Sequence, residues 1–155
     1  MAIYKTLEEL RAEKYANNKA AQSGYFSHVY KVKPPKSAAQ LESLIDEYCT
    51  LSKAECTIIY SGGRQLVSKT HIVDVLGRKN SITNSKFIPG TTRNGTSDII
   101  VVKNNKALYV ECKFSKSDRQ SENQKQWQKR VESFGNTYVI VRTLKEFITI
   151  FNEWK

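Results

Sequence analysis

Two acidic residues and a lysine occupy positions from which they could act on a phosphate ester. They are Asp98, Glu111 and Lys113, and the residues around them are rich in Ile, Val and Tyr. Carboxylate oxygens are the ligands that Mg²⁺ and Mn²⁺ prefer in proteins. A lysine ammonium beside such an ion can orient a water molecule or stabilise charge that develops on phosphate oxygens. The three side chains therefore suit metal-assisted hydrolysis, provided that the fold brings them together.

A β-hairpin is the element that would do so. The arms Asp98 to Val102 and Ala107 to Lys113 are rich in strand-forming residues. Between them, Asn104 and Asn105 tolerate the left-handed conformations of a two-residue turn. With these two residues at the turn, every opposed pair has residue numbers that sum to 209, so Asp98 lies opposite Glu111.

Side chains alternate along a strand, so one face of the second arm carries chemistry and the other carries the core. The first face holds Tyr109, Glu111 and Lys113, and the second holds Leu108, Val110 and Cys112.

Opposed carboxylates repel each other unless a positive charge lies between them. We expect a divalent cation there, bound by Asp98, Glu111 and a backbone carbonyl such as that of Val110. The alternative is a solvated hairpin face with an ordinary Glu-x-Lys pair, because charged residues often alternate along a strand.

These residues also carry a family resemblance. Asp98 followed by Glu111-Cys112-Lys113 resembles the Asp…Glu-x-Lys signature of the PD-(D/E)xK nuclease superfamily, with Ser97 at the loosely kept proline position. Four segments in order are similar to its VRR-Nuc group, and the similarity spans about Arg93 to Phe151; the segments are Gly95 to Asp98, Val110 to Lys113, Ser121 to Gln124 with Trp127, and Gly135 to Arg142.

The resemblance implies a restriction-endonuclease-like α/β core and a Mg²⁺- or Mn²⁺-dependent endonuclease that hydrolyses DNA. It implies that a glutamate of the first core helix, best matched by Glu42, joins the metal site, although Glu42 is also one of several ordinary surface acids. It favours Gln124 as a residue that binds phosphate or water beside Lys113, whereas the sequence around Gln124 equally suits a helix cap. Small members resemble Holliday junction resolvases, which are often phage-encoded homodimers.

The charge of the chain favours a polyanionic partner. Its 155 residues include 25 Lys and Arg against 15 Asp and Glu, which gives a net charge of +10 and a pI near 9.5. Such an excess attracts nucleic acid through phosphate contacts, although it could also serve solubility alone. The basic residues gather around the proposed site. We expect five residues there to contact DNA: Arg93, Lys116, Arg119, Ser121 and Lys125.

Composition fits one modest globular core, with 39% hydrophobic residues and no apolar run long enough to cross a membrane. Three cysteines without paired spacing indicate a reducing compartment. We therefore expect a cytoplasmic protein, located in the host cytoplasm if it is phage-encoded.

The elements expected along the chain form a mixed central sheet flanked by helices. Residues 1–36 form an N-terminal helix, from Thr6 to Ala21, and a connection, and residues 37–155 form the nuclease-like domain. That domain runs helix, three strands, helix, strand, helix; the elements outside the hairpin begin at Ser37, Cys56, Ser121, Asn136 and Thr143. Trp127, Val131 and Phe134 form the expected buried stripe of the helix that starts at Ser121.

The stretch from Arg64 to Arg93 has the least defined pattern. Leu66 to Leu76 fits a helix or a strand, Gly77 to Asn80 fits a turn, and Phe87 to Gly90 fits a loop that leads into the site. Its basic residues would make it a flap that faces DNA; they are Lys69, Arg78, Lys79, Lys86 and Arg93.

Three functions stay open at this point. A structure-selective endonuclease would cut branched DNA, and a restriction-type nuclease would cut linear duplex at one sequence. A non-catalytic module would bind DNA or RNA with steep salt dependence and leave it intact.

Overall fold

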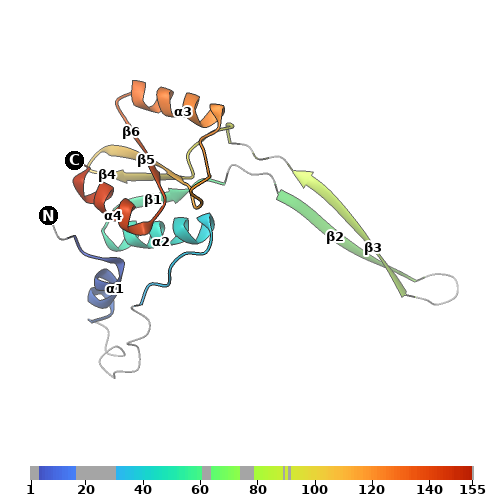
Figure 1. The fold of residues 1–155 in the computed structure, drawn as a ribbon. Coiled ribbons are helices and arrows are strands. Elements are labelled where there is room, and N and C mark those ends of the chain that lie inside the picture. Colours follow the sequence, from blue (N-terminus) through green and yellow to red (C-terminus); the bar gives the residue numbers. More distant parts are fainter. Residues whose placement is uncertain are drawn as a thin grey trace. The chain divides into compact units, whose positions relative to one another are not determined.

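The computed structural model of the protein describes residues 4–16, 31–60, 64–73, 79–88, 90 and 92–154. The chain divides into two compact units, one made of Met1–Ile59 and Gly95–Lys155 and the other of Tyr60–Asn94 (Figure 1). In the described residues, no helix is both long and apolar enough to span a bilayer.

The larger unit is built on a mixed four-stranded sheet with the strand order β1-β4-β5-β6. Strands β1, β4 and β5 are antiparallel neighbours, whereas β6 runs parallel to β5. The strands are β1 (Glu55–Ile58), β4 (Ile99–Lys103), β5 (Lys106–Cys112) and β6 (Thr137–Val141). The helices are α1 (Leu7–Ala16), α2 (Ala38–Leu51), α3 (Glu122–Ser133) and α4 (Leu144–Glu153). The expected order of helix, three strands, helix, strand and helix is confirmed for the elements of the larger unit from α2 to α4. In the chain, two strands of the smaller unit lie between β1 and β4, and the sequence did not predict them as a pair.

Strands β4 and β5 form the hairpin that the sequence predicts. The pairs run from Ile99 opposite Val110 to Lys103 opposite Lys106. Asn104 and Asn105 occupy the turn with φ angles of 52° and 61°, in the left-handed region. The predicted register is confirmed, and its continuation by one residue brings Asp98 opposite Glu111.

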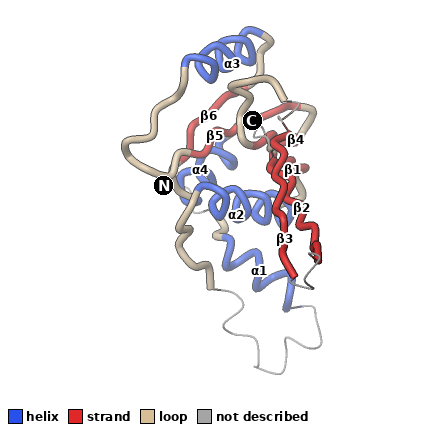
Figure 2. Tube along the Cα trace, turned by 90° about the vertical axis from the view of Figure 1, so that its right-hand side faces the viewer, coloured by secondary structure: helices blue, strands red, loops and turns tan. Residues whose placement is uncertain are grey.

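The apolar face of the sheet packs on α2 and α4, and α3 covers the opposite face (Figures 1 and 2). Tyr48 of α2 meets Phe147 and Phe151 of α4 edge to face, with ring centroids 6.1 and 5.5 Å apart. Leu7 of α1 is buried in the same core. The N-terminal helix and the following domain therefore share one hydrophobic interior; its strand residues are Ile99, Val101, Leu108, Val110, Cys112 and Val141.

Helix α3 begins and ends as the sequence predicts. Ser121 and Gln124 form a reciprocal capping box, and Gly135 follows the helix with a positive φ of 77°. Val131 is buried, but Phe134 is 78% exposed, so its expected place in the buried stripe is wrong. Phe134 is the C-cap, where the side chain has already turned away from the helical stripe.

The smaller unit contains one two-stranded antiparallel sheet made of β2 (Arg64–Val73) and β3 (Lys79–Ile88). The strand alternative for Leu66 is confirmed. The turn expected at Gly77 to Asn80 is wrong for Lys79 and Asn80, and the loop expected from Phe87 is wrong for Phe87 and Ile88, because these residues belong to β3. Hydrogen-bonded pairing of β2 with β3 over ten residues outweighs the weak turn and loop preferences of these residues.

Helix α1 starts at the predicted cap. The hydroxyl of Thr6 accepts a hydrogen bond from the Glu9 backbone N–H at 3.2 Å, and Glu9 accepts one from the Thr6 backbone N–H at 2.6 Å. The predicted continuation to Ala21 lies outside the described residues.

Candidate active site

Glu111 and Lys113 meet on the face of β5 that α3 covers. The Nζ atom of Lys113 lies 2.9 Å from Oε1 of Glu111. Only 2% of the Glu111 side chain and 13% of the Lys113 side chain are exposed. A buried ion pair of this kind costs desolvation on both sides, so it points to a use beyond stability.

Asp98, the residue immediately before β4, lies close to this pair. Its Oδ2 atom accepts a hydrogen bond of 2.8 Å from the backbone N–H of Cys112, between Glu111 and Lys113 in the chain. This bond fixes the carboxylate beside the last residues of β5. The structure therefore brings together the three residues that the sequence singles out.

Gln124 contributes to the site and to the helix cap with the same side chain. Its Oε1 atom accepts hydrogen bonds from the Ser121 backbone N–H at 2.8 Å and from Lys113 Nζ at 3.2 Å. Its Nε2 group donates to Oε1 of Glu111. The capping role is therefore confirmed, and the same side chain also contacts Lys113 and Glu111. The expected contact of Gln124 with phosphate or water stays a prediction.

Tyr138 of β6 holds the other oxygen of Glu111. Its hydroxyl donates to Oε2 of Glu111 over 3.2 Å. Burial, followed by the negative charge of Glu111, raises the pKa of the Tyr138 hydroxyl, so this group stays a donor at neutral pH. The carboxylate of Glu111 is held by three different side chains, from Lys113, Gln124 and Tyr138.

Glu42 brings a third carboxylate near the pair. Burial raises the pKa of Glu42, and the negative charges of Asp98 and Glu111 raise it further. Repulsion between charges is stronger in the protein interior than in water, because the dielectric constant is lower there. Glu42 on α2 therefore shares an electrostatic environment with the two acids of the hairpin.

Burial is also the main cause of the raised pKa values of Asp98 and Glu111. For Asp98, the Cys112 backbone N–H and Lys113 act in the opposite direction. For Glu111, the hydrogen bond to Lys113 lowers the pKa while Asp98 raises it. The Lys113 ammonium therefore compensates part of the charge of Asp98 and Glu111.

This oxygen-rich cluster has donor atoms of the type that a hard divalent cation prefers. Within the part of the chain that the structure describes, no three His, Cys, Asp or Glu side chains are arranged as a ready-made metal cage. The donor chemistry fits Mg²⁺ or Mn²⁺ because such ions keep several waters and need few protein ligands. Burial raises the pKa of the Cys112 thiol, with Asp98 and Glu42 adding to the effect, so this thiol is neutral and a poor ligand.

The backbone carbonyl expected to assist is better sought at Cys112 than at Val110. Val110 lies opposite Ile99 inside the β4–β5 ladder. Cys112 lies beyond the last pair of that ladder, and its N–H turns toward Asp98. N–H and C=O of one strand residue point the same way, so the Cys112 carbonyl is directed to the Asp98 side.

A basic hollow adjoins Lys113. It has a volume of about 370 Å³ and contains one acid, Asp118; its other lining residues are Lys113, Arg119, Gln120, Lys125, Ile140 and Arg142. Two of the predicted DNA-contacting residues, Arg119 and Lys125, thus lie beside the carboxylate cluster. The hollow has the charge that a phosphate would need.

The other predicted contact residues are placed differently. Lys116 is exposed in the turn between β5 and α3. Ser121 is exposed as well, but its hydroxyl caps α3 by accepting from the Gln124 backbone N–H at 3.3 Å. Arg93 belongs to the smaller unit, so its contact with DNA stays a prediction.

Gly95 allows the loop before β4 to approach the start of α3. A Cβ atom at this position would lie 2.5 Å from the Asn123 carbonyl oxygen and 2.7 Å from the Gln124 backbone nitrogen. The φ angle of Gly95, 86°, is also unfavourable for other residues. This close approach sets the position of Gln124 relative to Asp98.

Two residues with a role here were not assigned one from the sequence. Tyr138 looked like part of an apolar strand, and only the parallel pairing of β5 with β6 brings it near Glu111. Arg142 donates to the carbonyl oxygens of Ser115 and Asp118, the second over 3.1 Å, and so holds the loop that carries Arg119. In the sequence, only their positions in the segment Tyr138 to Arg142, at the two ends of a predicted strand, pointed to these two residues.

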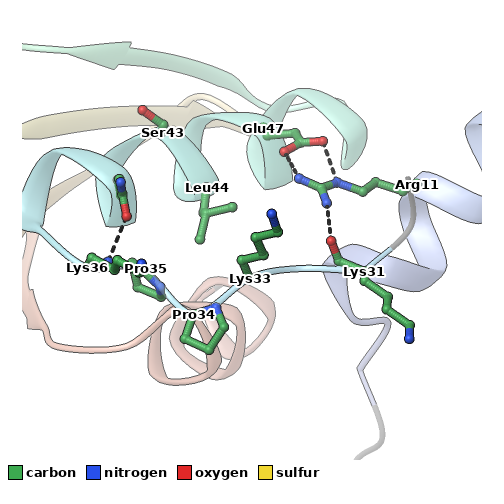
Figure 3. A pocket seen from close by; sticks show the side chains of 10 residues that line it. Arg11, Lys31, Lys33, Pro34, Pro35, Lys36, Ser43, Leu44 and Glu47 are labelled. Atoms are coloured by element: carbon green, nitrogen blue, oxygen red, sulfur yellow. Dashed lines mark hydrogen bonds and ion pairs between the residues drawn. The ribbon is translucent and has the colours of Figure 1, made fainter. Parts of the chain in front are cut away.

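A second hollow, of about 500 Å³, lies between α1, residues 31–36 and α2 (Figure 3). Arg11 donates from Nε and Nη2 to the two carboxylate oxygens of Glu47 at 2.7 and 2.6 Å, and from Nη1 to the Lys31 carbonyl at 3.2 Å. This bidentate pair ties α1 to α2. The described residues that line the hollow do not include the carboxylates of the cluster.

Comparison of the whole chain with models of protein families, with curated proteins and with solved structures finds no match.

Proposed function

We propose that the protein is a metal-dependent endonuclease that hydrolyses phosphodiester bonds of DNA, on a core of the restriction-endonuclease type. The observation that carries the proposal is the cluster of Glu42, Asp98 and Glu111, in which acids repel one another around a single lysine. Opposed acids of this kind are stabilised by a divalent cation. The basic hollow beside Lys113 supports a phosphate as the substrate group.

Each residue has a role in this proposal. Asp98 and Glu111 would hold the cation, with Glu42 and a backbone carbonyl assisting. A bound Mg²⁺ or Mn²⁺ would supply Lewis acidity and a more acidic water. Lys113 orients the attacking water and stabilises charge on the phosphate, while Gln124 and Tyr138 keep the Glu111 carboxylate in place.

The basic surface would hold the DNA backbone beside the centre, mainly through Arg119 and Lys125. By its resemblance to small junction resolvases, the protein would select branched DNA and act as a homodimer that cuts two strands.

The test is incubation of the full chain with linear, flapped, gapped and four-way DNA in Mg²⁺, Mn²⁺ or EDTA. We expect cleavage with either ion and none in EDTA. Asp98→Asn, Glu111→Gln and Lys113→Ala should each reduce the rate at least about 100-fold, the usual effect of removing one preorganised charged group.

Matched controls are Glu55→Gln and Lys145→Ala, because both residues are exposed and lie outside the cluster. These variants should cleave at the wild-type rate. Cleavage that persists in EDTA, or in all three site variants, would contradict the proposal.

A non-catalytic nucleic-acid-binding module is the second candidate. One observation favours it: Glu111 already has protein donors on both oxygens. Under this alternative the three site variants would bind DNA like the wild type, and the DNA would remain intact with every ion.

A further inference from the structure

The β2–β3 ribbon exposes both of its faces. The strands pair without interruption from Arg64 opposite Ile88 to Val73 opposite Lys79 (Figure 1). From Leu66 to Thr70 every side chain is exposed, and so is every side chain from Thr83 to Phe87. A two-stranded sheet of this kind is only marginally stable in water by itself. A bound partner would therefore stabilise the ribbon.

The charge of this unit identifies the kind of partner. Residues 60–94 contain six Lys and Arg and one Asp, a net charge of +5, which is half of the net charge of the whole chain. The two strands themselves contain four basic residues and no acid. Such a charge is complementary to a polyanion, and the strands also expose the apolar side chains of Leu66, Val67 and Phe87.

One face of the ribbon has the side chains that recognise base edges. The register sets Ser68 opposite Asn84, and Leu66 opposite Lys86, on one face. Asparagine can bond adenine in two places, lysine can bond guanine, serine suits several bases, and an apolar group can contact the methyl group of thymine. These residue types occur together on a face where Leu66, Ser68, Thr70, Asn84 and Lys86 are all exposed.

The dimensions agree with duplex DNA rather than duplex RNA. The major groove of B-form DNA admits a two-stranded β-ribbon. Ten residues per strand extend about 34 Å, which is about one turn of B-form DNA. The major groove of an RNA helix is too deep and narrow for side chains to read.

We propose that the β2–β3 ribbon enters the major groove of duplex DNA, with the Ser68, Asn84 and Lys86 face toward the base edges. The inference takes DNA as the ligand from the proposed function, but it concerns binding and needs no cleavage. Lys69 lies on the other face of the ribbon and adds attraction to the phosphates.

The experiment measures binding of the full chain to labelled duplex DNA, duplex RNA and single-stranded DNA by fluorescence anisotropy, in EDTA, over a series of salt concentrations. We expect duplex DNA to bind most tightly. Lys69→Ala/Lys86→Ala should weaken binding to duplex DNA at least tenfold. It should also reduce the slope of log K against log salt by about one, because the phosphate contact of Lys69 contributes about 0.9.

Ser68→Ala/Asn84→Ala retains the charge, so it should weaken binding several-fold and leave the salt slope unchanged. Lys36→Ala/Lys145→Ala removes two exposed lysines of the other unit and should bind more tightly than the ribbon lysine variant. Thermal melting of each variant checks that the fold is intact.

Three results would overturn the inference: ribbon variants that bind duplex DNA like the wild type, duplex RNA bound at least as tightly, or a ribbon variant that turns an oligomer into a monomer. The last result would assign the ribbon to a second copy of the chain. EDTA prevents metal-dependent cleavage, so the binding result stays valid even if the protein proves not to be a nuclease. If the protein cleaves DNA but the ribbon variants bind DNA like the wild type, only the inference about the ribbon is rejected.

Discussion

The ammonium of Lys113 lies 2.9 Å from the carboxylate of Glu111, its neighbour two residues earlier on the same face of β5. Glu111 also receives hydrogen bonds from Gln124 on α3 and Tyr138 on β6. Three elements thus converge on one buried acid. These contacts can serve both stability and catalysis, and variants of each residue separate the two effects.

The buried acids should make the fold less stable as pH rises. Burial raises the folded-state pKa of Asp98 and Glu111 above the ordinary values of 3.8 and 4.5. A carboxyl with a raised pKa keeps its proton better in the folded state, so its contribution is fully present at low pH. It is lost as pH increases from the ordinary value through the raised folded one. Asp98→Asn should flatten this decrease in urea unfolding measured from pH 4 to 8; an unchanged profile would contradict it.

A divalent cation should restore that stability. Binding to the folded state alone raises the melting temperature in proportion to the logarithm of ligand concentration above Kd. We expect Mg²⁺ or Mn²⁺ to raise the melting temperature of the wild type, and EDTA to reverse the increase. Asp98→Asn should lose the effect, whereas Glu55→Gln should keep it. An equal shift in Asp98→Asn and the wild type would show that the ion binds elsewhere.

The two roles of Gln124 can be separated. Gln124→Glu keeps an oxygen for the Ser121 backbone N–H but replaces the N–H donor with a second carboxylate facing Glu111. Cleavage should therefore fall at least about tenfold. Ser121→Ala should cost about 1 kcal/mol of unfolding free energy with the cleavage rate retained. Both variants are measured by urea unfolding and by initial cleavage rates. If Gln124→Glu cleaves at the wild-type rate, Gln124 serves only as a capping residue.

Tyr138→Phe should change the pH dependence of cleavage. The hydrogen bond from Tyr138 lowers the pKa of Glu111 by stabilising its charged form. Without it, the pKa of Glu111 increases, and the ascending limb of the pH–rate profile should move to higher pH. Unfolding free energy should fall by about 1 kcal/mol, the usual net value of one hydrogen bond. A uniform decrease in rate at all pH values would indicate a packing defect instead.

Gly95→Ala should disturb both stability and cleavage, because its new methyl group would overlap the Asn123 carbonyl and the Gln124 backbone nitrogen. Gly135→Ala is the matched control: it has a positive φ of 77°, but nothing lies within 4 Å of the added carbon. We expect the control to lose about 1 kcal/mol of unfolding free energy and to cleave normally. Gly95→Ala should lose more stability and reduce the cleavage rate; equal behaviour of the two variants would contradict this.

The hairpin and the caps could be predicted from sequence because their signals are local. Asn104 and Asn105 define a turn, and Ser121 with Gln124 defines a helix start, without help from distant residues. The register then follows from the turn, and the register aligns Asp98 with Glu111.

Features that depend on distant segments were harder to foresee. Tyr138 approaches Glu111 only after β6 has paired with β5, and Gly95 matters because α3 starts against it. Apolar and polar residues do not alternate regularly along β2 and β3, and none of their described side chains belongs to the hydrophobic core. Periodicity therefore gave little indication of a ten-residue ladder.

The pairing register between β4 and β5 also limits how this protein can evolve. A one-residue slip of this register would turn Glu111 and Lys113 toward the hydrophobic interior, while Leu108 and Val110 would face water. Insertions within β5 that force such a slip should therefore abolish folding and chemistry in a single step. A library of random single-codon insertions should be depleted within β5, whereas the exposed turn at Asn104 and Asn105 can lengthen to three residues and keep the register.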